Sequence, residues 1–126
     1  MAIKFLNISN HAMTQDQITE LAAKGYEVTE LPQDLKDRWS QCDPETYTAL
    51  CKEIMDYMDD QEIYEAMLAG YPAAVVYMCV NARPGVTFFY AHTKRVSVEE
   101  QLADGSVVKR NVFKHEGFHV YDIVVY

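Results

Sequence analysis

Residues 86–95, with the sequence V-T-F-F-Y-A-H-T-K-R, constrain the fold of this chain more than any other stretch. Pro84 and Gly85 precede the run, and its first six residues are rich in β-branched and aromatic side chains without polar alternation. Such a run is typical of a strand that is buried on both faces of a parallel sheet, so we predict a central strand here. Ligands of open α/β sheets bind beyond the carboxyl ends of the strands. A site is therefore expected to begin at the polar and basic end of this run.

Runs of strand character and helix character alternate along the rest of the chain. Strands are predicted at residues 2–9, 26–31 and 63–69, the second of them at or near the sheet edge. Helices are predicted at residues 14–24, 44–60 and 73–83, with a short helical segment that contains Leu35 and Trp39. Residues 95–102 and 106–113 predict a hairpin around a two-residue Asp104-Gly105 turn, and residues 121–126 a last short strand. The sum is one three-layer α/β domain over residues 1–126, with a mainly parallel sheet and a C-terminal β-hairpin.

Composition and charge restrict the class of protein. The longest apolar runs are far shorter than the ~20 residues of a membrane span, and the start does not resemble a signal peptide, so we expect a cytoplasmic protein without membrane contact. The net charge of −8 argues against broad binding to long nucleic acids, which requires many phosphates to be neutralised. Residues 26–66 hold twelve acidic and three basic residues, whereas residues 91–115 hold five basic and three acidic ones. The basic part begins at the end of the predicted central strand.

Three strand ends are expected to meet at one side of the parallel sheet. Their residues are Ser9, Asn10 and His11 after the first strand, Gly70 and Tyr71 after the third, and His92, Thr93, Lys94 and Arg95 at the end of the fourth. Helices follow the first two loops, so free backbone N–H groups and positive helix ends would face the same crevice. That arrangement suits phosphate, with added charge from the two basic residues and an aromatic surface from Tyr71 or Tyr90 for a base.

Other readings of these residues remain open. A Lys-Arg pair that leaves a strand is commonly a solvated turn, and a single histidine after a strand is commonly a loop or capping residue. Ser9 and His11 lack a matching acid for a Ser-His-Asp hydrolase. His115 and His119 lie in an extended segment without a further ligand, so no metal site is predicted. Because the glycines form no nucleotide-binding motif and the three cysteines no C-x-x-C pair, we expect no cofactor and no disulfide framework.

Three motifs together resemble the small standalone Csx-type ring nucleases of type III CRISPR systems. They are I-S-N-H-A-M-T-Q-D-Q at residues 8–17, F-Y-A-H-T-K-R at residues 89–95 and D-G-S-V-V-K-R-N-V-F-K-H-E-G-F at residues 104–118. The resemblance implies a Rossmann-like (CARF-like), usually dimeric domain that degrades a cyclic oligoadenylate, commonly cyclic tetra-adenylate. Residues that match its motifs are His11, Thr14, Gln17, Thr93, Lys94, Arg95, Phe113, His115 and Phe118. Asn10 stands where a serine is expected, and Gly117 and His119 replace basic residues.

The resemblance leads to the hypothesis of a metal-independent ring nuclease. Lys94 and Arg95 would hold the scissile phosphate, Thr93 and Ser9 would orient it, and His11 would transfer a proton. His92 and His115 would contact the ligand beside the loops named above. We further expect a homodimer, because a symmetric ring suits two copies of one site and because residues 73–83 are nearly all apolar. The alternatives are a module that binds a cyclic nucleotide without cutting it and a structural accessory subunit.

Overall fold

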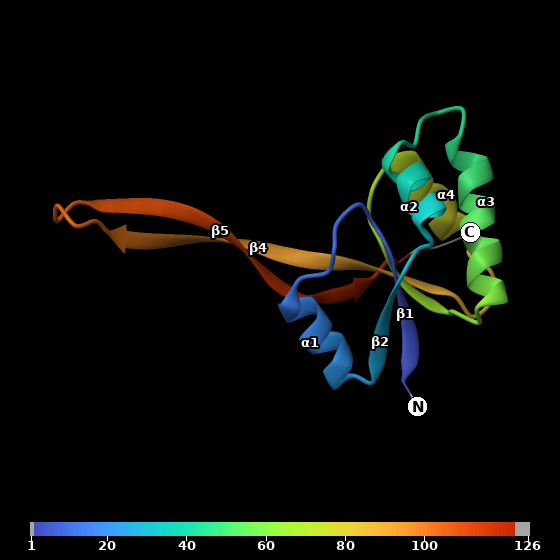
Figure 1. The fold of residues 1–126 in the computed structure, drawn as a ribbon, viewed down its shortest axis with the longest axis horizontal. Coiled ribbons are helices and arrows are strands. Elements are labelled where there is room, and N and C mark those ends of the chain that lie inside the picture. Colours follow the sequence, from blue (N-terminus) through green and yellow to red (C-terminus); the bar gives the residue numbers. More distant parts are fainter. Residues whose placement is uncertain (1, 123–126) are drawn as a thin grey trace.

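The computed structural model describes residues 2–122 and shows a mixed α/β fold around one five-stranded sheet (Figure 1). Along the chain, the elements are β1 (Ile3–Ile8), α1 (Gln15–Ala23), β2 (Tyr26–Glu30), α2 (Gln33–Ser40), α3 (Tyr47–Asp60), β3 (Glu65–Leu68), α4 (Pro72–Val80), β4 (Thr87–Gln101) and β5 (Val107–Val120). The strand order is β2-β1-β3-β4-β5, in which only the pairing of β4 with β5 is antiparallel. The predictions of a mainly parallel sheet, of β2 at an edge and of β4 in a central position are confirmed.

Helices lie on both faces of this sheet. Phe5 and Leu6 are neighbours in β1 and are both buried, but they belong to separate clusters because successive side chains of a strand point to opposite faces. Phe5 packs in a cluster that includes Leu21 of α1. Leu6 packs in a larger cluster with residues of α2, α3 and α4, including Trp39 and Ile54. The sheet is therefore the middle layer of the fold, as predicted.

Local sequence signals explain where the helices begin. Thr14 caps α1: its Oγ1 accepts a hydrogen bond from the Gln17 N–H, and the Gln17 side chain accepts one from the Thr14 N–H. Pro72 is the first residue of α4, a position that needs no N–H donor. The predicted start of α3 near Pro44 was wrong by three residues. Oδ1 of Asp43 accepts hydrogen bonds from the N–H groups of Glu45 and Thr46, which holds a turn before the helix begins at Tyr47.

The C-terminal hairpin is much longer than predicted. The central strand does not end at Arg95 but continues as β4 to Gln101 (Figure 1). It is paired with β5 from Phe89 to Gln101, with a shift in register between His92 and Thr93. Only its beginning is covered on both faces: Phe88 is buried in the larger cluster, and Phe89 packs against the smaller one. Residues 93–115, here called the arm, extend away from the helices as a two-stranded ribbon, and none of residues 97–111 is buried.

The turn of the arm also differs from the prediction. The Leu102 N–H donates to the Ser106 carbonyl oxygen and the Gly105 N–H donates to the Leu102 carbonyl oxygen, so three residues form the loop instead of two. Gly105 has a φ of 88°, the left-handed conformation that closes a three-residue hairpin loop. Asp104 Oδ1 accepts from the Ser106 N–H at 2.9 Å and stabilises the turn. The predicted strand at residues 121–126 lies mostly outside the described residues, and Tyr121 and Asp122 are not in a strand.

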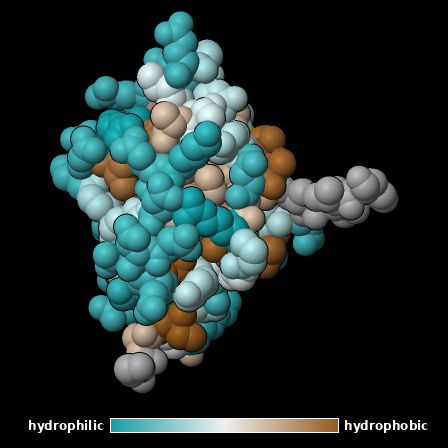
Figure 2. All heavy atoms as spheres, turned by 90° about the vertical axis from the view of Figure 1, so that its right-hand side faces the viewer, coloured by the Kyte–Doolittle hydropathy of each residue, from teal (hydrophilic) through white to brown (hydrophobic). Residues whose placement is uncertain are grey.

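The outer surface of α3 is acidic and exposed, as its sequence indicates. Figure 2 views the molecule from the side that carries α3, and this side is mostly hydrophilic with small separate hydrophobic patches. Along the described part of the chain, no helix combines the length and the apolar character needed to cross a membrane.

Candidate functional site

A cavity of about 400 Å³ lies at the carboxyl ends of the parallel strands. The Ala69 N–H donates to the Ile8 carbonyl oxygen at 3.0 Å, which places the ends of β1 and β3 at the same level. β2 and β3 are neighbours of β1 on opposite sides. The chain therefore adds β2 on one side of β1 and then crosses to the other side to add β3, which makes a topological switch point between β1 and β3. In open α/β sheets such a switch point is where ligands bind. The cavity is lined by Ser9, His11, Ala12, Thr14, Gln17, Met67, Ala69, Tyr90, Ala91 and Tyr121.

The loop between β1 and α1 is held by buried polar groups. Asn7 and Ser9 are 1% and 2% exposed, respectively. Asn7 Nδ2 donates to the His11 carbonyl oxygen at 2.8 Å, and Ser9 Oγ lies 2.7 Å from Asn7 Oδ1 and 2.9 Å from the same carbonyl. The Ser9 hydroxyl is thus engaged within the loop, where it positions His11. The imidazole of His11 is exposed at the cavity, and Asn10 is exposed but does not line it.

The expectation of free N–H groups at the start of α1 was wrong in part. The N–H groups of Thr14 and Gln17 are occupied by the capping box, and the His11 N–H donates to Ser9 Oγ at 3.3 Å. Asp16 adds a negative charge in the first turn. A phosphate in the cavity must therefore be neutralised mainly by side chains from elsewhere.

Gly70 and Tyr71 follow β3 at the expected place, but neither lines this cavity. Trp39 Nε1 donates to the Ala69 carbonyl oxygen at 3.0 Å, and a Cβ atom on Gly70 would lie only 2.7 Å from that nitrogen. Tyr71 is half-buried, with its ring centroid 6.0 Å from that of Tyr47. Gly70 thus packs against Trp39 of α2, and Tyr71 packs against Tyr47 of α3.

Lys94 and Arg95 lie on opposite faces of the arm, because β4 continues as a strand through both residues. Lys94 is directly opposite Lys114, whereas Arg95 is directly opposite Phe113. Side chains that are paired across two strands share a face, and successive side chains of a strand alternate. This placement on opposite faces argues against the predicted joint binding of one phosphate by Lys94 and Arg95. Thr93, on the same face as Arg95, is opposite His115.

His115 connects the arm to α1 instead of facing the cavity. Its side chain is 8% exposed, and Nε2 lies 3.2 Å from Glu20 Oε2. Its ring centroid is 5.0 Å from that of Phe118, which packs in the smaller cluster. These contacts indicate a structural role.

His92 belongs to a group of aromatic rings that begins at the cavity. Tyr90 and His119 are directly opposite in the sheet, and their rings stack with centroids 5.6 Å apart. The His92 and Tyr121 rings extend this group, at 5.9 Å from His119 and 5.1 Å from Tyr90. The sequence interpretation missed Tyr121, which lines the cavity, and His119, whose ring stacks on Tyr90. The register of the hairpin is the signal that reveals His119.

The cysteines offer no activated thiol, and none of them lines the cavity. Burial raises the pKa of Cys51 to about 12 and also raises the pKa of Cys79, so both thiols stay protonated at neutral pH. Burial likewise raises the pKa of Tyr121, whose hydroxyl donates to the Leu68 carbonyl oxygen at 2.6 Å. Within residues 2–122, no three His, Cys, Asp or Glu side chains are grouped so that they could hold a metal ion.

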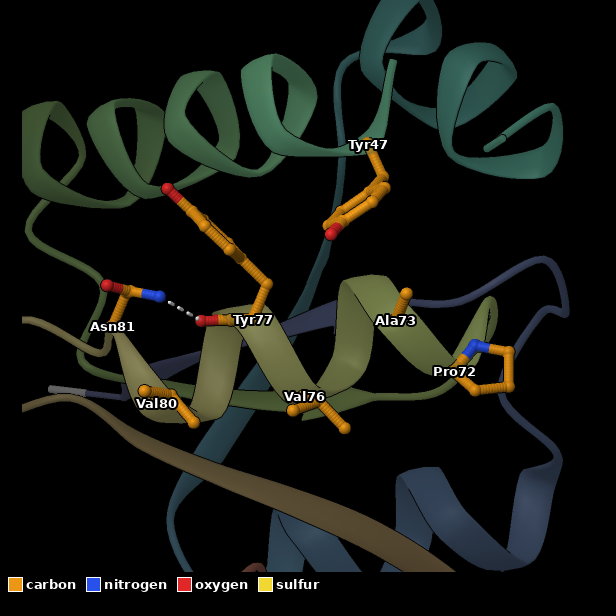
Figure 3. A pocket seen from close by; sticks show the side chains of 7 residues that line it. All are labelled: Tyr47, Pro72, Ala73, Val76, Tyr77, Val80 and Asn81. Carbon is orange, nitrogen blue, oxygen red and sulfur yellow. Dashed lines mark hydrogen bonds between the residues drawn. The ribbon is translucent and has the colours of Figure 1, made fainter. Parts of the chain in front are cut away.

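A second cavity, of about 480 Å³, lies between α3 and α4 and has a different character (Figure 3). Its lining is mostly apolar or aromatic, and Val76 and Val80 on α4 are 61% and 59% exposed. Tyr47 and Tyr77 meet edge to face there, with ring centroids 6.1 Å apart. Asn81 Nδ2 donates to the Tyr77 carbonyl oxygen, so this amide is engaged in ending the helix (Figure 3). This cavity is suited to apolar contact and not to phosphate chemistry.

No curated protein and no solved structure matches the chain significantly. A family model described as "Uncharacterized protein MJ1673 family" matches residues 3–119, which include every strand and helix of the fold except the last residue of β5. The chain therefore belongs to the uncharacterized protein MJ1673 family.

Proposed function

We propose that this chain is a metal-independent ring nuclease of type III CRISPR signalling, with a Rossmann-like (CARF-like) domain, that opens a cyclic oligoadenylate. Cyclic tetra-adenylate is the ring that the motif resemblance favours. The observation that carries the proposal is the cavity at the switch point of the sheet, where His11 and the Tyr90 ring come together from different elements. A proton-transfer group beside an aromatic surface suits a nucleotide whose ribose reacts and whose base stacks.

The reaction requires no nucleophile from the protein. The ribose 2′-hydroxyl loses its proton to the His11 imidazole, and its oxygen forms a bond to the adjacent phosphorus while the bond from phosphorus to the 5′ oxygen breaks. The 5′ oxygen takes up a proton from water, and the His11 imidazolium returns its proton to solvent, which leaves a linear oligoadenylate with a 2′,3′-cyclic phosphate. Holding these atoms in line lowers the barrier, because the bound ring loses little further freedom at the transition state.

A side chain of β4 neutralises the negative charge of the phosphate. Among residues 2–122, no lysine or arginine lines the cavity itself. Lys94 follows Tyr90 by four residues, so both side chains are on the same face of the strand. We assign phosphate binding to Lys94, and loop positioning to Ser9. Arg95 and Thr93, on the other face, are not part of this assignment.

Cleavage tests the proposal directly. Incubation with cyclic tri-, tetra- and hexa-adenylate in excess chelator is expected to convert at least one ring to the linear cyclic-phosphate product, which chromatography and mass spectrometry distinguish. His11→Ala should lower the single-turnover rate by about 10² while leaving affinity nearly unchanged, as expected for loss of a general acid or base. Gln15→Ala is the control, because this exposed side chain is close in sequence but does not line the cavity.

The rival functions predict other results. Tight binding of a ring without turnover would favour a module that sequesters the messenger. No binding to any ring would favour a structural accessory subunit. A His11→Ala variant as fast as the parent would make His11 a loop residue only.

A further inference from the structure

One face of the β4–β5 pair carries aromatic and cationic side chains in a row that starts at the cavity; on β5 the row is interrupted by Gly117 opposite His92 and by the register shift after it. Tyr90, His92 and Lys94 alternate along β4, so they share a face. His119 and Lys114 of β5 are directly opposite Tyr90 and Lys94 on this face. We call these five residues the β4–β5 strip. The stacked contact of Tyr90 with His119, at 5.6 Å and 29° between the ring planes, shows that these two side chains share a face.

Lys94 and Lys114 form an unusual pair. Two like charges directly opposite each other destabilise an antiparallel pair of strands. Both lysines are exposed, and neither has a carboxylate partner among the residues that the structure describes. By contrast, Arg110 in the same arm pairs with Glu100 at 3.5 Å. An anion between the two ammonium groups would relieve their repulsion.

The spacing along the strip corresponds to the dimensions of a nucleotide. His92 and Lys94 are two residues apart in one strand, or about 7 Å along its axis. That is the scale of the separation between the base and the phosphate of one nucleotide. Tyr90 and His119 present exposed ring surface beside them, since Tyr90 is 38% exposed. Stacking on aromatic side chains stabilises a bound base by about 1–3 kcal/mol.

We propose that the β4–β5 strip binds a second nucleotide unit, next to the one in the cavity, with its base on the His92, His119 and Tyr90 rings and its phosphate between Lys94 and Lys114. This inference rests on the proposed function in that the ligand is an adenylate chain, but it does not require cleavage. It assigns His119 and Lys114 to ligand binding. It also excludes Arg95 and Lys109, whose side chains lie on the opposite face of the same ribbon.

Lysines on the two faces of the arm can be substituted one at a time, so variants of one face serve as controls for variants of the other. Binding of cyclic tetra-adenylate and of linear tetra-adenylate is measured by calorimetry from low to high salt. Lys94→Ala and Lys114→Ala should each weaken binding by about tenfold and reduce the salt dependence, because each removes one contact with phosphate. Lys109→Ala removes the same charge from β5 on the other face, and its affinity should equal that of the parent. His119→Ala should weaken binding several-fold, and His119→Phe should restore it, because phenylalanine still stacks.

The outcomes separate this inference from the proposed function. If either adenylate binds in a way that depends on the two lysines but is not cleaved, the result supports the strip and contradicts the proposal of a ring nuclease. Cleavage that depends on Lys94 but is insensitive to both Lys114→Ala and His119→Ala supports the nuclease and overturns the strip. Equal losses of affinity in Lys109→Ala and Lys114→Ala would indicate general attraction of the ligand to a basic arm and would overturn the strip. The strip is also overturned if neither adenylate shows binding that depends on the two lysines.

Discussion

At the scale of single residues, Gly70 and Trp39 show how a packing contact can look like part of a ligand-binding loop. Gly70 stands after a strand and before a helix, where glycines commonly allow a phosphate to approach the backbone. Here the space beside its Cα is filled by the indole of Trp39, which is 1% exposed and donates to the neighbouring Ala69 carbonyl oxygen. The glycine is needed because a tryptophan lies against it.

We predict that Gly70→Ala lowers the free energy of unfolding by about 2–4 kcal/mol, through a clash with a buried side chain and an unfavourable backbone conformation. Gly25→Ala is the matched control, since Gly25 also has a positive φ, of 87°, but a Cβ there would meet no atom within 4 Å. Gly25→Ala should lower the free energy of unfolding by only about 1–2 kcal/mol. Urea denaturation measures both values. Equal losses in the two variants would show that backbone conformation alone matters at Gly70.

At the scale of elements, the arm is the part of the fold with the least support from the rest of the chain. A two-stranded ribbon alone is marginally stable in water, and this one is attached only at its base. There α1 meets β5 through Glu20 and His115. The outer residues pack on each other but not on the helices, so we expect the body to fold without them.

Replacing residues 97–111 with Asn-Gly, to join Val96 to Val112 by a two-residue turn, tests this independence. Val96 and Val112 are directly opposite, which is the geometry that such a turn requires. The shortened chain should unfold at a midpoint within a few degrees of the parent in thermal circular dichroism. It should also keep its affinity for adenylates, because Lys94 and Lys114 remain. Loss of cooperative unfolding would show that the outer arm stabilises the body.

At the scale of the whole molecule, the charge is divided between an acidic helical side and a more basic arm. Residues 26–66 hold twelve acidic and three basic residues, and they include α2 and α3. The exposed Val76 and Val80 of α4 interrupt this charged surface with an apolar area. We propose that a second copy of the chain covers α4, since a cyclic ligand with rotational symmetry is best bound by two identical sites.

Sedimentation equilibrium at micromolar concentration is therefore expected to give a dimer in the presence of cyclic tetra-adenylate. Val76→Lys should give a monomer, because it places a charge in the apolar contact. Ile18→Lys, at an exposed aliphatic residue of α1 on the other side of the sheet, should leave the dimer intact. If the parent protein stays monomeric with the ligand, the proposal that two copies of one site bind the symmetric ring is contradicted.

Much of the architecture was predictable because it depends on neighbouring residues. The capping box of Thr14 and Gln17, the proline that begins α4 and the run that begins β4 are local signals, and they led to the correct order of strands and helices. The cavity was predictable in position, since parallel strands end on one side of their sheet. His11 and Ser9 were placed there correctly for this reason.

The order of the elements, the mainly parallel sheet and the side on which the cavity lies were predictable from the sequence, because those follow from local propensity and periodicity. Tertiary structure alone decided the faces of the arm. A two-residue turn at Asp104-Gly105 would set Lys94 opposite His115, whereas the observed three-residue loop sets it opposite Lys114. A shift of one residue moves every side chain of a strand to the other face relative to its partner. Contacts between distant segments, such as Glu20 with His115 and Trp39 with Gly70, likewise arise only when the whole chain is folded.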